Sequence, residues 1–201
     1  MKNIIFFILF FFSFGIETNK INLPPNDFID WIILQNNETW IGWVQFEDFP
    51  ICKTERILNH NMLKISEVIE DKKNYPNIFE RLTQVKLYRD DILHIYLDMP
   101  FPVSSRDYIV KYEYRESRNL KEYYFYSVDY PNSIQFDDSI HLPNAGGKWI
   151  LEELNNNQTK VTYLWNGELL GEFPNWALKR AWTTQGNEVL DWLNSALYRT
   201  E

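Results

Sequence analysis

Arg106 is the residue whose type and position in this sequence point most directly to chemistry. It begins a segment, residues 106–115, in which aromatic and charged side chains alternate. Successive side chains of a β-strand point to opposite faces, so Arg106 would share the inward face with Tyr108 and Tyr112. A buried guanidinium is costly unless an anion meets it. The pattern therefore predicts a protein carboxylate or the head group of a ligand beside Arg106.

A purely structural role for Arg106 is the alternative. Its guanidinium could pair with Asp107, or with Asp98 of a neighbouring strand, and hold the loop formed by residues 99–105, because the arginine fork suits carboxylates as well as phosphates. The variant Arg106→Leu separates the two roles. Altered ligand choice would indicate a head group, whereas lost stability with unchanged binding would indicate a loop contact.

Aromatic side chains make up 17% of the chain and recur along the alternating segments. Most of them are expected in the core, where a tyrosine hydroxyl still needs a hydrogen-bond partner. Several on one wall would line a cavity that has a few polar points. The candidate ligand contacts of this type are Tyr108, Tyr112, Tyr124, Tyr126, Trp149, Tyr163 and Trp182.

Catalytic and metal-binding patterns are not found in the sequence. His60 and His94 have no second histidine or carboxylate at metal-ligand spacing, and there is no phosphate-binding glycine loop or nucleophile elbow. The adjacent carboxylates Asp137-Asp138 and Glu152-Glu153 would diverge on strands or turns. We therefore expect no cofactor, no metal and no enzymatic activity.

The N-terminus resembles a secretory signal peptide. Lys2 precedes an apolar run over residues 4–12, and small residues follow it. We predict a signal peptide over residues 1–15, cleaved after Gly15, and a spacer over residues 16–26, so the protein would be exported and periplasmic or secreted. An uncleaved anchor or a buried N-terminal strand is the alternative.

The charge of the chain argues against several partners. The formal net charge is −8, and no block of lysine or arginine interrupts the acidic balance. Nucleic acid is therefore a poor partner, since its binding depends on neutralising phosphates, and strong electrostatic docking to anionic membranes is disfavoured. The single cysteine, Cys52, excludes an intrachain disulfide and a cysteine-rich zinc site.

The hydrophobic periodicity predicts one α+β domain over residues 27–201. Helices are expected over residues 27–35, with Asn26 as a possible N-cap, and over residues 61–70, while residues 75–82 are either a loop or a short helix. Turns are expected at Asp90, Gly146-Gly147 and residues 155–157. Alternating segments predict strands at 40–46, 51–58, 83–89, 91–98, 106–115, 122–130, 147–154 and 158–166.

A long amphipathic helix is predicted from Pro174 to about Tyr198. Its apolar stripe consists of Leu178, Trp182, Val189, Leu193, Ala196 and Leu197. Gly186 lies on the same stripe, where a glycine costs about 1 kcal/mol relative to alanine. Close approach of the sheet or of a ligand would explain it. Together the elements predict a strongly curved antiparallel sheet of about eight strands around this helix, with an internal hydrophobic cavity.

Three stretches resemble the START family of lipid-binding and lipid-transfer proteins. They are PFPVSSRDYIVK at residues 100–111, IHLPNAGGKWILEEL at residues 140–154 and TKVTYLWNGELLGEFPNWALK at residues 159–179. Their order and spacing match the family over about residues 27–199. The family's Arg-Asp pair corresponds to Arg106 and Asp107, whereas His141 stands where many members have an arginine. His141 is therefore a further candidate ligand contact.

The resemblance implies a helix-grip fold whose tunnel holds one lipid or sterol, gated by the C-terminal helix and adjacent loops. We expect a monomer that binds a lipid or another hydrophobic small molecule, transfers it and contacts membranes transiently. The alternatives are a cyclase-like or hydrolase-like helix-grip enzyme, in which His94, His141 and tyrosines could move protons, and a hydrophobic-ligand sensor that transfers nothing.

Overall fold

The computed structural model describes residues 18–199 except residues 132, 134 and 135. The strands are β1 (Thr18–Asn19), β2 (Ile32–Asn36), β3 (Trp40–Phe46), β4 (Phe49–Leu58), β5 (Leu82–Arg89), β6 (Ile92–Leu97), β7 (Ser105–Ser117), β8 (Leu120–Val128), β9 (Ser139–His141), β10 (Gly146–Asn155) and β11 (Gln158–Asn166). The helices are α1 (Met62–Glu70), α2 (Tyr75–Ile78) and α3 (Leu178–Arg199), with 3-10 turns at Lys72–Asn74 and Asn175–Ala177.

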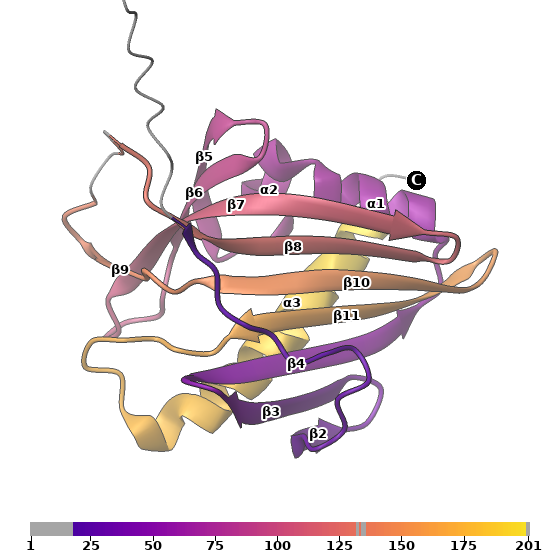
Figure 1. Cartoon of the computed structure of the whole chain (residues 1–201), viewed down its shortest axis with the longest axis horizontal. Coiled ribbons are helices and arrows are strands. Elements are labelled where there is room, and N and C mark those ends of the chain that lie inside the picture. Colours follow the sequence, from indigo (N-terminus) through magenta and orange to yellow (C-terminus); the bar gives the residue numbers. More distant parts are fainter. Residues whose placement is uncertain (1–17, 132, 134–135, 200–201) are drawn as a thin grey trace, which may run out of the picture.

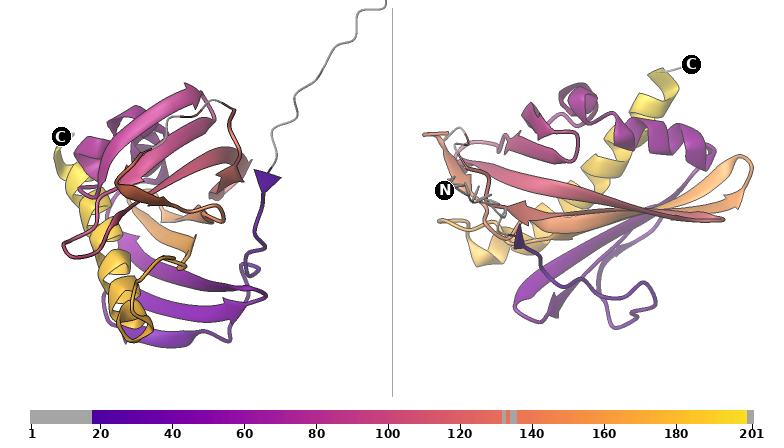
Figure 2. Two further views of the ribbon diagram at one scale, coloured as in Figure 1. Left: turned by 90° about the vertical axis from the view of Figure 1, so that its left-hand side faces the viewer. Right: turned by 45° about the horizontal axis from the view of Figure 1, so that its top comes forward.

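The strands form one sheet in the order β2-β3-β4-β11-β10-β8-β7-β6-β5, with β1 paired to β8 and β9 paired to β7. All of these pairs are antiparallel except β7 with β9. The sheet curves around α3, which crosses its concave face together with α1 and α2 (Figures 1 and 2). The predicted helix-grip architecture is confirmed.

The main core lies between α3 and the concave face. Its centre holds side chains that are fully enclosed, from α1, the sheet and the last turns of α3: Ile65, Leu151, Val161, Leu190, Leu193 and Leu197 are each 0% exposed. Burying a leucine or isoleucine side chain contributes about 1.5–3 kcal/mol. The apolar stripe of the predicted C-terminal helix is thus the main attachment of α3 to the sheet.

Two predictions for the N-terminal part of the domain are wrong. No helix forms over residues 27–35: the segment makes a turn and then β2, which pairs with β3 at the sheet edge. Asn26 does not cap a helix, because its side chain donates to Glu122 and accepts from Lys148. This pairing of β2, together with the very short β1 and β9, explains why the sheet has 11 strands among the described residues rather than about eight.

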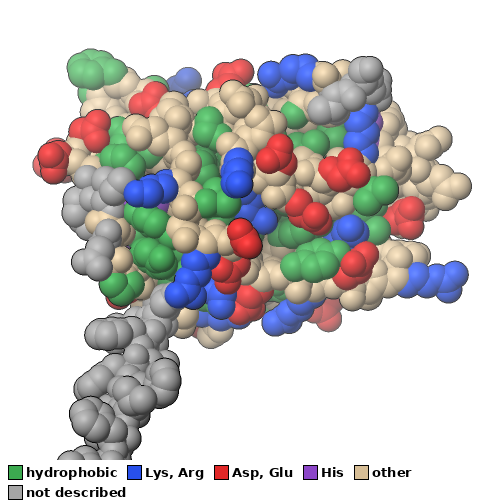
Figure 3. All heavy atoms as spheres, turned by 90° about the horizontal axis from the view of Figure 1, so that it is seen from above, with side chains coloured by type: hydrophobic (Ala, Val, Ile, Leu, Met, Phe, Trp, Pro, Cys, Tyr) green, Lys and Arg blue, Asp and Glu red, His purple; other side chains and the backbone are tan. Residues whose placement is uncertain are grey.

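The N-terminal part of the described chain crosses the convex face of the sheet. Residues 20–31 run over β8, β10 and β4 on the face opposite α3 (Figures 1 and 2). The predicted signal peptide, residues 1–15, lies outside the described residues. Among the described residues, no helix is both long and apolar enough to span a membrane. On the face seen from above, acidic and basic side chains are interspersed (Figure 3).

Candidate functional site

A cavity of about 330 Å³ lies between the concave face of the sheet and α3. Strands β6, β7, β8, β10 and β11 contribute its floor, α2 closes one side, and the loops over residues 98–104 and 167–177 form its mouth. Its volume falls within the range of small-molecule sites, which are typically about 300–1,000 Å³. The floor is aromatic and consists of Tyr108, Tyr112, Phe125, Trp149 and Tyr163.

The rings of this floor pack against one another across four strands. Tyr163 lies 4.3 Å from Trp149 and 6.0 Å from Phe125, measured between ring centroids. Phe125 extends over Gly147, where an added Cβ would lie 2.6 Å from its Cζ and would also overlap the carbonyl oxygen of Leu164. Gly147 therefore lies inside β10 because of close packing. The predicted turn at Gly146-Gly147 is wrong, since β10 already begins at Gly146.

The hydroxyl groups of the floor differ in their partners. The Tyr112 hydroxyl is hydrogen-bonded to that of Tyr75, which in turn donates to the carbonyl oxygen of Ile69 at 2.7 Å. Burial raises the pKa of Tyr108 and of Tyr163 well above the ordinary value. These tyrosines therefore present neutral hydroxyls to the cavity at any physiological pH.

An ion pair forms part of the cavity wall. Arg81 donates two hydrogen bonds to Glu188 of α3, each 2.7 Å long. These hydrogen bonds to the Glu188 carboxylate raise the pKa of Arg81. Nearer the N-terminal end of α3, Arg180 and Gln185 also line the cavity. The pair joins the start of β5 to the middle of α3 and leaves no net charge at that point of the wall.

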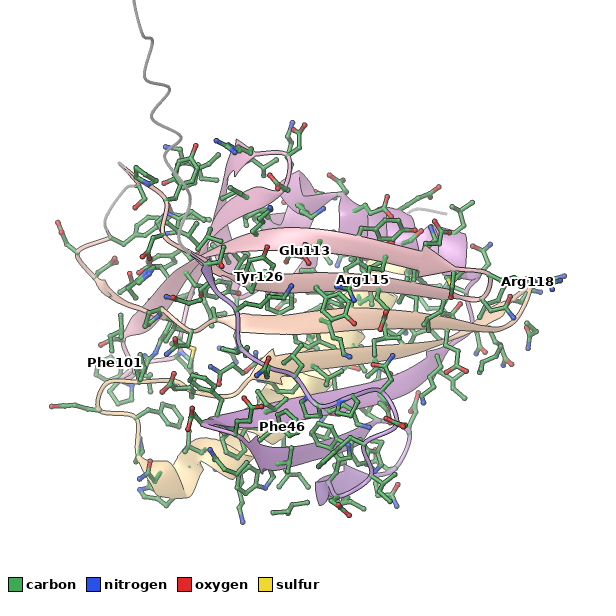
Figure 4. The ribbon with its side chains drawn as sticks, in the orientation of Figure 1. Phe46, Phe101, Glu113, Arg115, Arg118 and Tyr126 are labelled. Atoms are coloured by element: carbon green, nitrogen blue, oxygen red, sulfur yellow. The ribbon has the colours of Figure 1, made fainter. Side chains whose placement is uncertain are left out.

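The mouth of the cavity carries two exposed aromatic side chains. Phe101, in the β6–β7 loop, is 97% exposed, and Trp176, just before α3, is 85% exposed. Phe101 lies at one end of the molecule and Arg118 at the other (Figure 4). Met99, Pro100 and Phe173 add further apolar side chains to the lining at these loops. Exposed apolar patches of this kind mark ligand-binding grooves or surfaces that interact with proteins or membranes.

Arg106 does not line the cavity. Its side chain is buried at 1% exposure beneath the mouth. The guanidinium donates to the carbonyl oxygens of Leu169 at 2.9 Å and of Leu170 at 3.1 Å, and it also donates to that of Ser104. Backbone carbonyls therefore take the place of the anion that the sequence predicted, and Arg106 ties together the two loops of the mouth.

Two of the candidate tyrosines lie on the opposite face of the sheet. The Tyr126 hydroxyl donates to Glu113 at 2.8 Å, and both residues are seen side by side on the convex face (Figure 4). Tyr124 donates to Glu122 and lies under the guanidinium of Arg115. Both positions have the opposite strand phase to Phe125, so these side chains cannot reach the cavity.

His141 lies in β9, also outside the cavity, in a polar cluster on the convex face. The Asp107 carboxylate accepts a hydrogen bond from Ser139 Oγ at 2.6 Å. Its other oxygen lies 2.8 Å from His94 Nε2 and 2.9 Å from His141 Nδ1. Burial raises the pKa of Asp107, but the hydrogen bonds from Ser139 and the two histidines outweigh it and hold the pKa below its ordinary value.

Stability should therefore depend on the Asp107 charge at acid pH. Because the folded-state pKa is depressed, the contribution is complete above the unfolded value, about 4, and is lost as pH falls through the folded value. We expect the difference in unfolding free energy between wild type and Asp107→Asn to shrink between about pH 5 and pH 2. Urea unfolding across this range measures it, and a difference independent of pH would contradict the assignment.

Trp182 and Gly186 lie on the buried face of α3 but do not line the cavity. The Trp182 indole donates to the carbonyl oxygen of Gly167 at 2.8 Å and packs 5.0 Å from the Trp43 ring. Gly186 faces β3 and β4, where a Cβ would lie 2.9 Å from Ile41 Cδ1 and 3.3 Å from Thr54 Cβ. Close approach of the sheet, not of a ligand, explains this glycine.

A larger side chain at residue 186 should overpack the interface of α3 with β3 and β4. We expect Gly186→Leu to lower the free energy of unfolding by about 1–3 kcal/mol and to leave the capacity for hydrophobic ligands unchanged. Thermal melting and ligand stoichiometry on the same preparation check this. Raised stability with reduced ligand uptake would instead place residue 186 at the cavity.

The cavity thus includes four of the candidate residues: Tyr108, Tyr112, Trp149 and Tyr163. Sequence reasoning missed Phe125, which shares the strand phase of the inward-facing Tyr123, and Glu188 and Gln185, which lie beside the apolar stripe of α3. It also missed Phe101, which is exposed at the tip of a loop, and Arg81, which pairs with Glu188 across the cavity. Neither position belongs to a periodic pattern of hydrophobic residues in the sequence.

Comparison with known proteins places the fold. No family profile matches the sequence, and no curated protein matches it. Among solved structures, a STAR-related lipid transfer protein from Xanthomonas axonopodis is 16% identical, with a TM-score of 0.71 over 84% of this chain and 98% of that one. Human STARD10 is 12% identical, with a TM-score of 0.76 over 92% of this chain and 83% of that one.

A more distant match is an aromatase/cyclase from Streptomyces sp. R1128, 12% identical, with a TM-score of 0.54 over 74% of this chain and 93% of that one. The likeness to START domains predicted from the sequence is therefore confirmed in the fold. The chain has the START-type helix-grip fold, a fold whose solved examples include lipid-transfer proteins.

Proposed function

We propose that this protein binds a single lipid or other hydrophobic small molecule in the cavity beneath α3 and carries it between membranes. The observation that carries the proposal is an aromatic-floored cavity of about 330 Å³ whose mouth bears exposed apolar side chains. A carrier needs both features, because the ligand must be shielded from water and must also pass directly between bilayer and protein.

Binding is favoured over catalysis by the position of the titratable groups. The histidines that could move protons, His94 and His141, belong to the Asp107 cluster on the convex face, away from the cavity. The tyrosines of the cavity floor have raised pKa values, which makes them poor bases. Recovery of a chemically unchanged ligand after prolonged incubation would support binding, whereas a product would support the enzyme alternative.

The ligand can be identified directly. Organic extraction of the full-length protein, purified from its native source and analysed by mass spectrometry, should yield a lipid-like compound in a ratio approaching one per chain. The double variant Trp149→Ala with Tyr163→Ala, which removes the centre of the floor, should copurify with less of it. An extract without any enriched hydrophobic compound, together with failure to take up lipid from vesicles, would reject the proposal.

Transfer should depend on the exposed aromatics at the mouth. We expect the double variant Phe101→Ser with Trp176→Ser to slow exchange of fluorescent lipid between phosphatidylcholine vesicles by at least about tenfold, since each large apolar side chain contributes roughly 1.5–3 kcal/mol when it leaves water. Its melting temperature should not change, because both side chains are almost fully exposed in the folded protein.

Leu63→Ser provides the matched control. Leu63 is 62% exposed on α1, remote from the mouth, so its loss should leave the exchange rate unaltered. Equal slowing in both variants would indicate a general loss of surface hydrophobicity. An unchanged rate in the double variant, with ligand binding intact, would favour a sensor that transfers nothing.

We also propose that the protein is exported and acts as a monomer. The apolar run over residues 4–12 after Lys2 supports export, and N-terminal sequencing of the mature protein should find a start near Ile16. Recovery of intact Met1 in a membrane fraction would instead indicate an anchor. Light scattering of the purified protein measures the oligomeric state.

A further inference from the structure

The cavity continues into a small chamber that carries its own polar groups. This chamber measures about 50 Å³ and shares six residues with the main cavity: Leu97, Tyr108, Phe125, Tyr163, Leu169 and Gln185. It lies at the sheet end of the cavity, beneath the loop that follows β11. Its lining includes the polar side chains of Asn144, Trp165, Asn166 and Glu168, and three more that it shares with the main cavity: Tyr108, Tyr163 and Gln185, from β7, β11 and α3.

These three side chains lack protein partners. Within the part of the chain that the structure describes, the hydroxyls of Tyr108 and Tyr163 and the amide of Gln185 make no hydrogen bond to another residue, although all three side chains are partly buried. The buried tyrosines Tyr75 and Tyr123, by contrast, each donate a hydrogen bond to a protein acceptor. Buried polar groups are almost always hydrogen-bonded in native proteins, so unpaired ones that face a cavity point to a partner supplied from outside the chain.

The size and charge of the chamber limit what that partner can be. A space of about 10–15 Å³ admits one water molecule, so about 50 Å³ admits a hydroxyl or carbonyl group but not a large charged head group. Glu168 also lines the chamber and would repel a carboxylate or phosphate. Arg180, the cation that α3 contributes to the wall of the main cavity, is exposed and absent from the chamber lining.

Building on the proposed lipid-binding function, we propose that this chamber receives the uncharged polar group of the ligand and so selects neutral lipids that carry a hydroxyl or carbonyl. The ligand enters with its polar end first. Its oxygen accepts hydrogen bonds from the hydroxyls of Tyr108 and Tyr163. The amide of Gln185 donates a further hydrogen bond to a carbonyl ligand or accepts one from a hydroxyl ligand. Its hydrocarbon part fills the main cavity toward the mouth. A ligand held by Arg180 would bind in the opposite direction, with a charged head group outside.

Three probes of equal chain length separate these possibilities: 1-hexadecanol, palmitate and hexadecane. Equilibrium binding to the full-length protein should rank hexadecanol above both others. The double variant Tyr108→Phe with Tyr163→Phe should weaken hexadecanol about 3–10-fold for each hydroxyl removed and leave hexadecane unaffected. Phenylalanine keeps the stacked rings, so the variant should fold, which its melting temperature verifies. Tyr123→Phe is the control, because its hydroxyl binds Glu70 outside the cavity.

Each other outcome has a definite meaning. Unchanged hexadecanol affinity in the double variant would overturn the inference and would indicate that ordered water, not the polar group of the ligand, occupies the chamber. Tighter binding of palmitate that is lost in Arg180→Gln would overturn it in favour of a charged head group at the mouth. If hexadecane binds as tightly as hexadecanol, the proposed function stands and the inference fails. If the wild type binds none of the three probes, the proposed function fails first.

Discussion

Arg106→Leu should lower the free energy of unfolding by about 2–5 kcal/mol, since a buried carbonyl left without a partner costs roughly 1–3 kcal/mol. The substitution removes the donors that serve Leu169 and Leu170 on one side of the mouth and Ser104 on the other. A leucine can occupy part of the volume but supplies no donor. Both loops of the mouth should therefore lose their common attachment.

The loosened mouth should also be visible in ligand kinetics. We expect faster release of bound lipid with little change in which lipid is bound, because Arg106 does not line the cavity. Hydrogen exchange should increase over residues 99–104 and 167–173. Arg106→Lys should recover only part of the stability, because a single ammonium cannot reproduce the planar fork of donors.

Arg115→Leu is the matched control for this experiment. Arg115 lies on the same strand but is exposed on the convex face, beside Tyr124 (Figure 4). Its replacement should change stability by no more than about 0.5 kcal/mol. A similarly small loss in Arg106→Leu would contradict the proposed attachment of the two loops. An altered choice of lipid with full stability would show that the side chain contacts the ligand.

Gly147→Ala should be the second strongly destabilising substitution, at about 1–3 kcal/mol or more. The added methyl group would overlap the carbonyl oxygen of Leu164, a backbone atom of the neighbouring strand, and would press on the Phe125 ring. Neither can move without disturbing the pairing of β10 with β11 or the stack of Phe125 on Tyr163. The cavity floor should distort together with the sheet.

Gly146→Ala tests whether the position, and not the loss of glycine, is responsible. Its new methyl group would approach Ile21 Cγ1 at 2.9 Å, and that side chain can rotate away, while the nearest backbone atom, the carbonyl oxygen of Phe125, lies at an ordinary contact distance of 3.5 Å. Chemical denaturation of both variants and uptake of hexadecanol measure the contrast. Equal stability of the two variants would show that the strands adjust easily around residue 147.

Much of this protein follows from its sequence. The strict alternation over residues 106–115 placed Tyr108 and Tyr112 on the inward face, because neighbouring side chains of a strand must point in opposite directions. The stripe from Leu178 to Leu197 identified the long C-terminal helix that packs against the sheet. Local periodicity determines such features, and together they predicted a curved sheet with an aromatic wall around a long helix. The likeness to START domains came from the three similar stretches within residues 100–179.

The tertiary structure decided the features that depend on residues far apart in the chain. Segment 27–35 had a helical pattern, but pairing with β3 made part of it a strand. The alternation of side chains along the strand predicted that Arg106 lies on the inward face. That its guanidinium donates to backbone carbonyl oxygens depends on the packing of residues 167–171 over it. The same holds for Gln185 beside Tyr108 and Tyr163, which α3, β7 and β11 bring together. Hydrogen-bond partners and cavity walls are formed by residues that lie far apart in the sequence, and a local pattern of residues does not reveal which of them will be in contact.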